Sequence, residues 1–374
     1  MKKVGIVTIN DYDNYGNRLQ NYAVQEVIKA LKLEAETIIY DRNSRTKDNN
    51  ITFAYRLKKF LSQPISSKFD KLSYYFINKI NVKQSNHRKK LFKEFSKRYI
   101  NESEFVISMV DIQDTYLEKY DFFITGSDQV WNYVFGFGTP IDFLTFVPKD
   151  KRIAYAPSFG VSFIADEFIK DYTIWLNDIK SISVREQAGA KIIKDLTGRE
   201  AAVLVDPTLM LSKEKWLTIS KEALSKPKKK YILTYFLGKE NKIRSNYIKK
   251  LAKSNNMEVV NLGDIKKKNY YMTDPSEFLD YINSADLLCT DSFHGVIFSI
   301  IMKTPFIVFD RITNSPSMNS RIETLLKIFH LEARIMNGIE FDGDVFDIDY
   351  SHVGCILEIE QKKALEYLKE ALNL

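Results

Sequence analysis

The turn from Cys289 to Gly295 carries the side chains of this chain that are best suited to chemistry. The run Ala285 to Leu288 precedes it and predicts a short buried strand, and the largely apolar run Val296 to Met302 follows it and predicts a buried helix. His294 therefore lies where a helix begins, and the free backbone amides there favour a phosphate or a carboxylate. His294 could instead cap the helix or hydrogen-bond inside the core, and the local sequence leaves both interpretations open.

Three neighbours of His294 fit the same turn. Asp291 or Ser292 can cap the predicted helix through a side-chain oxygen. Gly295 lets the backbone approach a ligand closely. The turn therefore predicts an anion-binding site.

A second polar turn follows the predicted buried strand Tyr120 to Thr125. Gly126 can supply an unusual backbone angle, and Ser127, Asp128 and Gln129 present donors and acceptors that can bind hydroxyls. Such groups recognise sugars, although the same residues could simply form an Asx-type turn that closes the strand.

Strands and helices alternate along the rest of the chain, which predicts an α/β protein with mostly parallel sheets. The predicted strands are Val4–Ile9, Thr37–Tyr40, Phe122–Thr125, Arg152–Ala156, Ser181–Val184, Ala202–Val205, Tyr231–Phe236, Glu258–Asn261, Ala285–Cys289 and Pro305–Phe309. We expect two Rossmann-like domains, residues 1–208 and 209–374, in a GT-B-like arrangement with a central cleft. The last helix is expected to pack back on the first domain.

Ligands of such domains bind beyond the carboxyl ends of the strands. Four polar segments follow predicted strands, namely Asn14–Arg18, Gly126–Asn132, Arg185–Glu186 and Asp291–Gly295. All four are therefore expected at the cleft, which favours a functional role for each.

Composition excludes several classes of protein. The chain has 374 residues, of which 45% are hydrophobic, so it can form well-packed cores and is not intrinsically disordered. No apolar stretch approaches the ~20 residues of a membrane span. Two cysteines, Cys289 and Cys355, and four scattered histidines predict neither a disulfide framework nor a metal site, and favour a reducing cytoplasm.

The net charge of +7 comes from one segment. Between Arg56 and Arg98 there are thirteen lysines and arginines against Asp70 and Glu94, a local balance of +11 that leaves about −4 for the rest. With its interleaved aromatics, the segment predicts a basic helical excursion at about residues 43–100, in one or two helices around a loop near residues 84–86. It could bind an anionic membrane surface or be a solvated helical face. No nucleic-acid-binding module surrounds it, so no nucleic-acid partner is expected.

Several motifs occur in the order and spacing seen in the polysaccharide pyruvyl transferase family, which the chain resembles from about Val4 to Ile328. They are Asn14-Tyr15-Gly16-Asn17, Gly126-Ser127-Asp128-Gln129-Val130-Trp131, Ser183-Val184-Arg185-Glu186, Asp206-Pro207-Thr208-Leu209 and Asp291-Ser292-Phe293-His294-Gly295. The resemblance implies transfer of pyruvate from phosphoenolpyruvate to a sugar of a surface-polysaccharide precursor, as a cyclic ketal, with release of phosphate. Phosphoenolpyruvate is then the donor substrate, and no cofactor or metal is required.

This chemistry needs a general acid, a base and groups that hold phosphate. We expect catalytic roles for His294 and Asp128. The remaining expected site residues bind the donor (Arg185, Arg321, Ser292, Gly295) or the acceptor (Asn17, Arg18, Gln129, Asp291).

The chain departs from the family at one position. Many members carry an arginine two positions before the histidine, whereas this chain has Ser292, as a subgroup of the family does. A hydroxyl cannot replace the bidentate charge of a guanidinium. Arg185, Arg321 and Lys303 are the candidates to supply the missing charge, although each could be a surface or helix-end cation.

Two other functions stay open at the level of sequence. The fold also suits a glycosyltransferase that uses a nucleotide sugar, because fold does not fix function. The basic segment and Ser292 would also suit a catalytically silent scaffold of a glycan assembly complex. We expect a cytoplasmic protein, peripheral on the inner face of the cell membrane, with a lipid-linked glycan as acceptor.

Overall fold

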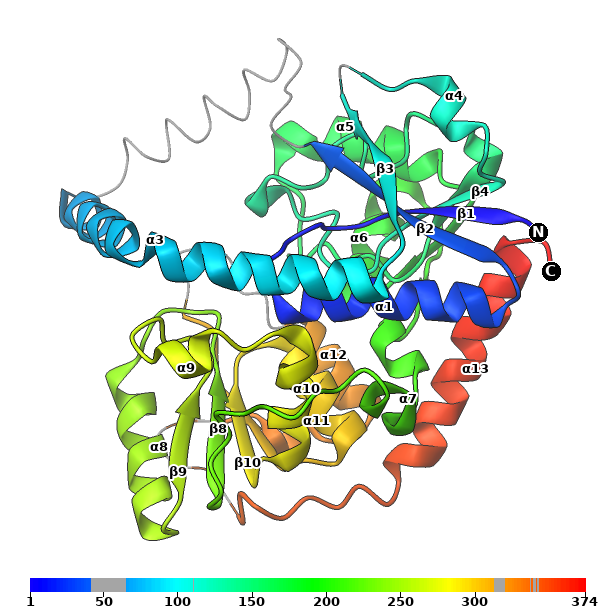
Figure 1. Cartoon of the computed structure of the whole chain (residues 1–374). Helices are drawn as coiled ribbons and strands as arrows, with labels where there is room; N and C mark the ends of the chain where they lie inside the picture. The colour runs from blue at the N-terminus through cyan, green and yellow to red at the C-terminus, as the bar shows by residue number, and fades with distance from the viewer. Residues whose placement is uncertain (42–64, 110, 313–319, 337, 339–340, 342) are drawn as a thin grey trace.

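Seven parallel strands form the sheet of the N-terminal half of the protein in the computed structural model (Figure 1). The structure describes residues 1–41, 65–109, 111–312, 320–336, 338, 341 and 343–374, and of residues 65–81, 114 and 116 the backbone alone. The order across the sheet is β3-β2-β1-β4-β5-β6-β7. The strands are β1 (Lys3–Val7), β2 (Glu34–Asp41), β3 (Glu102–Ser108), β4 (Phe122–Thr125), β5 (Arg152–Ala154), β6 (Ser181–Val184) and β7 (Ala202–Val203).

Helices cover both faces of this sheet, as expected for parallel strands. One face packs on α1 (Tyr15–Ala30) and α3 (Ile65–Tyr99), which lie between the sheet and the second domain (Figure 1). The other face packs on α4 (Asp114–Leu117), α5 (Asp166–Asn177) and α6 (Gln187–Thr197). Burial on both faces explains why β4 is buried at all of its positions.

A four-stranded parallel sheet forms the second domain, in the order β11-β10-β8-β9. Its strands are β8 (Tyr231–Tyr235), β9 (Glu258–Asn261), β10 (Leu287–Thr290) and β11 (Phe306–Val308). Its helices are α8 (Lys242–Ser254), α9 (Lys268–Tyr271), α10 (Pro275–Ser284), α11 (Phe293–Met302) and α12 (Ser320–Ile328), and α7 (Lys213–Leu217) precedes β8. The fold is thus the predicted α/β class with two parallel sheets.

An apolar core joins the two sheets through α1. The same cluster of buried side chains contains Val4 of β1 and Leu288 of β10. Tyr15 of α1 stacks on Phe278 of α10, with ring centres 4.3 Å apart. The Tyr15 hydroxyl donates to the Thr273 carbonyl at 3.1 Å. The two domains therefore pack directly against each other.

The last helix, α13 (Val353–Ala371), runs from the second domain to the end of the first sheet (Figure 1). The Tyr367 hydroxyl donates to the Ala154 carbonyl of β5 at 2.7 Å. Lys2 Nζ donates to the Leu372 carbonyl at 3.3 Å. The chain end thus contacts the domain in which the chain begins.

The basic excursion differs from its prediction. Helix α3 is continuous from Ile65 to Tyr99, so the loop expected near residues 84–86 is wrong. Arg88 is 4% exposed. Its guanidinium pairs with Asp13 at 2.5 Å, and it donates to the Tyr15 hydroxyl at 2.7 Å and to the Tyr271 carbonyl at 2.6 Å. Arg88 therefore joins the two domains, whereas residues 43–64 lie outside the described part of the chain.

The predicted strands correspond to β1, β2 and β4–β11, with ends shifted by a few residues. Strand β3 was not predicted. It lies at the edge of the sheet, and its residues Glu102–Ser108 are only partly buried, so they lack the continuous apolar run of the inner strands.

Candidate functional site

The switch point of the first sheet lies between β1 and β4, where the strand order reverses. The turn after β1 leads to Asn17 in the first turn of α1, and the turn after β4 carries Asp128. Asn17 Nδ2 donates to Asp128 Oδ2 at 3.2 Å. Gly126 has a φ of 107°, and a Cβ there would lie 2.5 Å from the Tyr155 carbonyl oxygen, so only glycine fits this turn.

The switch point of the second sheet lies between β8 and β10. Ser292 caps α11, because its Oγ accepts from the Gly295 amide at 3.3 Å. His294 is consequently held in the first turn of α11. The two switch points face each other, and the side chains after β1, β4, β6 and β10 meet there.

His294 lies between the two domains. Its Nε2 is 3.7 Å from Asp206 Oδ2, and the Nε2 atom is buried without a hydrogen-bond partner among the described residues. On the other side of the ring, a Cβ built on Gly16 would lie 2.1 Å from Nδ1. A glycine at the start of α1 is therefore what leaves room for the imidazole.

Asp206 is the residue that connects the cluster, and it was not among the predicted site residues. Its carboxylate accepts from Arg185 Nη1 at 2.5 Å, from Ser127 Oγ at 2.8 Å and from the Thr208 amide and hydroxyl at 3.0 and 2.6 Å. Burial opposes ionisation, but the proximity of His294 and the charge of Arg185 hold the pKa of Asp206 well below its usual range. Asp206 is therefore an anion that holds the guanidinium of Arg185 and lies beside the imidazole of His294. Asp206 is the first residue of the motif Asp206-Pro207-Thr208-Leu209, and this position could have indicated a functional role.

Two arginines lie over the ring of Phe293. The guanidinium carbons of Arg185 and Arg321 are 4.2 and 5.7 Å from the ring centre, and each residue is 3% exposed. The Nε atoms of both lack a hydrogen-bond partner in the described residues. Burial, together with the like charges of Arg185 and Arg311, lowers the pKa of Arg321 to about 9. Arg185 is thus ion-paired with two carboxylates, whereas Arg321 is buried with its Nε atom unpaired among the described residues.

Asp128 joins this cluster from the first sheet. Its Oδ1 is 3.5 Å from Arg185 Nη2. Burial raises the pKa of Asp128, but the charges of Arg185, His294 and Arg321 outweigh burial, and the net shift is downward. Asp128 is therefore an ionised carboxylate beside the two arginines.

Glu186 is a further buried carboxyl; its segment was expected at the cleft, but the residue was given no role of its own. Its Oε1 accepts from Ser158 Oγ and the Phe159 amide at 2.9 Å each and from the Gly160 amide at 3.3 Å. Its Oε2 has no hydrogen-bond partner in the described chain. Burial raises the pKa of Glu186 despite the nearby arginines. Glu186 follows Arg185 in the motif Ser183-Val184-Arg185-Glu186, and this position could have indicated a functional role.

Several predicted site residues have their functional groups engaged elsewhere. Arg18 is fully buried, where it pairs with Glu102 at 3.0 Å and donates to the Ile9 carbonyl at 2.8 Å. Gln129 Oε1 accepts from Asn132 Nδ2 at 2.8 Å. These contacts support the cluster rather than point into it.

Two residues of the turn that carries His294 have structural contacts as well. The Asp291 carboxylate accepts from the Leu237 and Gly238 amides at 2.7 and 2.9 Å. A Cβ on Gly295 would lie 2.9 Å from Thr290 Oγ1, so this glycine permits close packing within the turn. Lys303 follows the far end of α11, so it cannot replace an arginine beside His294.

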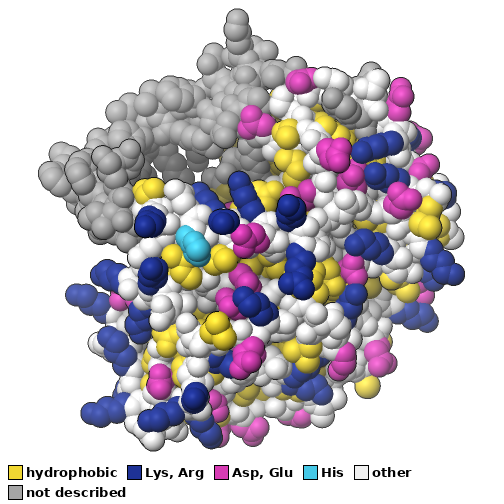
Figure 2. All heavy atoms as spheres, in the orientation of Figure 1, with side chains coloured by type: hydrophobic (Ala, Val, Ile, Leu, Met, Phe, Trp, Pro, Cys, Tyr) yellow, Lys and Arg dark blue, Asp and Glu magenta, His cyan; other side chains and the backbone are white. Residues whose placement is uncertain are grey.

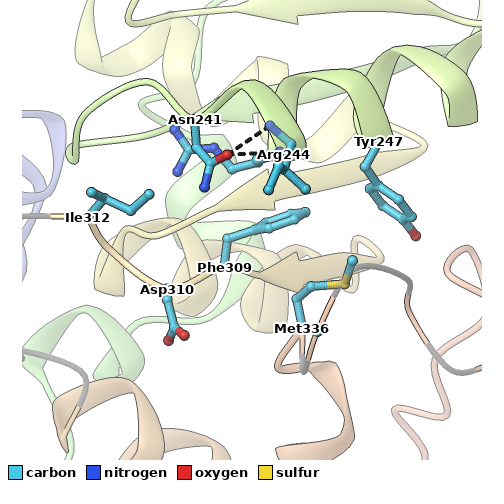
Figure 3. Close-up of a pocket in the computed structure, with 9 residues that line it drawn as sticks. Asn241, Arg244, Tyr247, Phe309, Asp310, Ile312 and Met336 are labelled. Carbon is cyan, nitrogen blue, oxygen red and sulfur yellow. Dashed lines mark hydrogen bonds between the residues drawn. The ribbon is translucent and has the colours of Figure 1, made fainter.

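A separate cavity of about 180 Å³ lies at the start of α8 (Figure 3). Arg244, Phe309 and Met336 are among its lining residues. Arg244 Nη1 is 3.9 Å from Asp291 Oδ2, so this cavity lies next to the Asp291 end of the turn that carries His294.

Two doubly wound parallel sheets with a polar cluster between their switch points define a GT-B-like protein. The UDP-N-acetylglucosamine 2-epimerase of Rickettsia bellii is similar to this chain at 10% identity and a TM-score of 0.51, over 100% of this chain and 97% of that one. The UDP-GlcNAc 2-epimerase of Neisseria meningitidis, bound to UDP-GlcNAc, is similar at 10% identity and a TM-score of 0.50, over 100% and 99%. At these identities the likeness establishes the fold alone.

The family is established by the sequence itself. The model of the polysaccharide pyruvyl transferase family matches residues 14–312, which is most of the chain. The chain therefore belongs to the polysaccharide pyruvyl transferase family and is a transferase. A comparison with curated proteins found no match.

Proposed function

We propose that the protein transfers the pyruvyl group of phosphoenolpyruvate to two hydroxyls of a saccharide precursor, forming a cyclic ketal and releasing phosphate. The observation that carries this proposal is the buried guanidinium of Arg321, which has a lowered pKa and an unpaired Nε atom and lies near the ion-paired Arg185 over the ring of Phe293. A donor with a phosphate and a carboxylate supplies negative charge at both ends. Guanidinium groups hold such planar anions with paired hydrogen bonds.

His294 and Arg185 hold the phosphate in this reaction. Both lie beside Asp206, so an imidazole and a guanidinium meet the phosphate together. Positive charge placed there stabilises the phosphate as it separates from C2 of the donor. Arg321, which lies on the second domain as His294 does, then binds the donor carboxylate.

Asp128 acts on the acceptor. Once the methylene carbon of the donor has gained a proton, C2 becomes electron-poor and a saccharide hydroxyl attacks it. Asp128 is ionised and buried, so it takes the proton of that hydroxyl. The C2–O bond to phosphate then breaks, and a second hydroxyl closes the ketal. Asn17 orients Asp128 through its amide.

The basic face of α3 gives the protein an affinity for membranes. Lys89, Lys90, Lys93 and Lys97 are exposed, and Figure 2 shows basic side chains spread over the middle of the face on which α3 lies. In the described part of the chain, no helix is long and apolar enough to cross a membrane. Each basic residue near an anionic leaflet contributes about 1 kcal/mol, so a few of them support reversible binding close to lipid-linked glycan precursors.

The proposal is tested by binding and turnover together. Calorimetry should detect phosphoenolpyruvate binding that Arg321→Leu weakens at least ~10-fold, because a buried charged partner is lost. Turnover on a panel of lipid-linked and nucleotide-linked saccharides should release phosphate only when an acceptor is present. Binding of a nucleotide sugar with release of a nucleoside diphosphate, and no use of phosphoenolpyruvate, would overturn the proposal.

A further inference from the structure

We propose that Glu186 is the acid that protonates the methylene carbon of the donor. This inference rests on the proposed function, because it assigns one step of that reaction. It starts from the geometry of a carboxyl group that is fully buried and half unpaired.

The side chain of Glu186 is held by one oxygen only. Glu186 is the N-cap residue of α6, yet its side chain does not cap that helix. It turns instead to the loop after β5, where Ser158 and the amides of Phe159 and Gly160 donate to Oε1. These three donors fix the carboxyl and leave Oε2 as the atom that can carry a proton.

The second domain contacts the chain next to Glu186. The Gln187 amide donates to Thr324 Oγ1 of α12 at 3.4 Å. Arg321 lies three residues before Thr324, and residues so spaced share a face of a helix. The face of α12 that carries Arg321 therefore packs on the N-terminus of α6, so Glu186 and Arg321 lie on opposite sides of the domain boundary.

Arg185 does not neutralise Glu186, although it is the adjacent residue. Its guanidinium directs its ion pairs to Asp128 and Asp206. The charged groups that influence Glu186 are accordingly Arg185 at the end of β6 and Arg321 on α12. Both bind the donor in the proposed reaction, so the unpaired oxygen of Glu186 lies beside the donor.

The pKa values of Glu186 and Asp128, two carboxyl groups of the cluster, are shifted in opposite directions. Burial raises the pKa of Glu186, whereas the charges of Arg185 and His294 outweigh burial at Asp128 and lower its pKa. Environments that separate two carboxyl groups in this way assign one as the acid and the other as the base. Asp206 is excluded from proton transfer because four donors occupy its oxygens.

In this step Glu186 transfers its proton to C3 of the donor. The π electrons of the enol form the new C3–H bond, the O–H bond of Glu186 breaks, and positive charge develops at C2. The carboxylate that results is stabilised by its three donors and by the two guanidinium groups. One proton from the two acceptor hydroxyls restores Glu186, and the other leaves through Asp128 with the phosphate.

Glu186→Gln tests the assignment. The amide oxygen can still accept from Ser158, Phe159 and Gly160, so the fold and the melting temperature should be retained. We expect kcat to fall ~10²-fold or more, as for loss of a general acid. Affinity for phosphoenolpyruvate should stay equal or increase, because a carboxyl beside an anion is removed. Glu167→Gln is the same change at an exposed site of α5, and it should alter neither kcat nor the affinity for phosphoenolpyruvate.

The pH profile separates catalysis from a structural role. Since the acid form is the active one, wild-type kcat should decrease as pH rises through the pKa of Glu186, and Glu186→Gln should lack this limb. Full activity of Glu186→Gln with an unchanged limb would overturn the assignment, and so would loss of donor binding with a lowered melting temperature. Absence of turnover in the wild type would instead contradict the proposed function.

Discussion

The imidazole of His294 and the carboxylate of Asp206 approach each other from the two halves of the protein, with Nε2 3.7 Å from Oδ2. Asp206 follows the last strand of the first sheet, and His294 follows β10 of the second. The same carboxylate pairs with Arg185 at 2.5 Å. The relative placement of the domains therefore decides whether the proposed phosphate site is complete.

Gly16→Ala should reduce activity while leaving the protein folded. The new methyl group would lie 2.1 Å from His294 Nδ1, so the imidazole must move away from its place beside Asp206. Alanine is a better helix former than glycine, which offsets the cost of this shift by up to ~1 kcal/mol. We expect kcat to decrease at least ~10-fold with a melting temperature within a few degrees of wild type. An active Gly16→Ala variant would show that the position of the imidazole does not matter.

Arg321→Leu should produce a protein that is as stable as wild type or more stable without ligand. A buried charge without a full partner is unfavourable, so an apolar side chain at this position removes that cost. The same variant should lose the rise in melting temperature that phosphoenolpyruvate gives to the wild type. Lys327→Leu removes an exposed charge from the same helix and is the matched control. If Arg321→Leu is strongly destabilised, the arginine is a structural residue.

Asp206→Asn should destabilise the protein in a pH-dependent way. The pKa of Asp206 in the folded protein lies below its unfolded value, so its contribution to stability is present above about pH 4 and is lost as the pH falls. Breaking a buried ion pair costs ~3–5 kcal/mol near pH 7. Denaturation of both proteins between pH 3 and pH 7 should show the difference narrowing toward acid. A constant difference would mean that the carboxylate charge is not what stabilises the fold.

Charge reversal of Lys89, Lys90 and Lys93 should weaken sedimentation with anionic liposomes at low salt. These side chains are exposed, whereas Arg88 is buried between the domains and is unsuitable for this test. Binding by the wild type should also decrease steeply as salt rises. Reversal of Lys249, Lys250 and Lys253 on α8 changes the net charge equally and is the control. Equal sedimentation of the two triple variants would argue against a membrane-binding face on α3.

Much of the fold follows from local patterns in the sequence. The runs Phe122–Thr125 and Ser181–Val184 are strands with the predicted bounds, because inner parallel strands are covered on both faces and leave a largely apolar signal. Strand β3 escaped prediction because an edge strand is only half buried. The turns that follow β4 and β10 were expected to meet. They belong to different sheets, and the packing of the two domains brings Ser127 of one turn and His294 of the other to Asp206.

The partners of individual side chains could not be predicted. Arg18 and Asp291 lie at the expected turns. The guanidinium of Arg18, however, pairs with Glu102, and the carboxylate of Asp291 accepts hydrogen bonds from two backbone amides. Arg88 belongs to a run of basic residues, yet it alone is directed at Asp13 and Tyr15. Such pairings depend on contacts between residues distant in sequence, which no local pattern records.

The most direct test of the central claim uses phosphoenolpyruvate with ¹⁸O in the bridging position. In the proposed reaction the C2–O bond breaks, so the label should leave with the phosphate, and the acceptor should gain the mass of a pyruvate ketal without label. Mass spectrometry of both products on a responsive acceptor reads out both predictions in one experiment. Label retained in a pyruvate product, or phosphate release without a pyruvylated acceptor, would contradict the account.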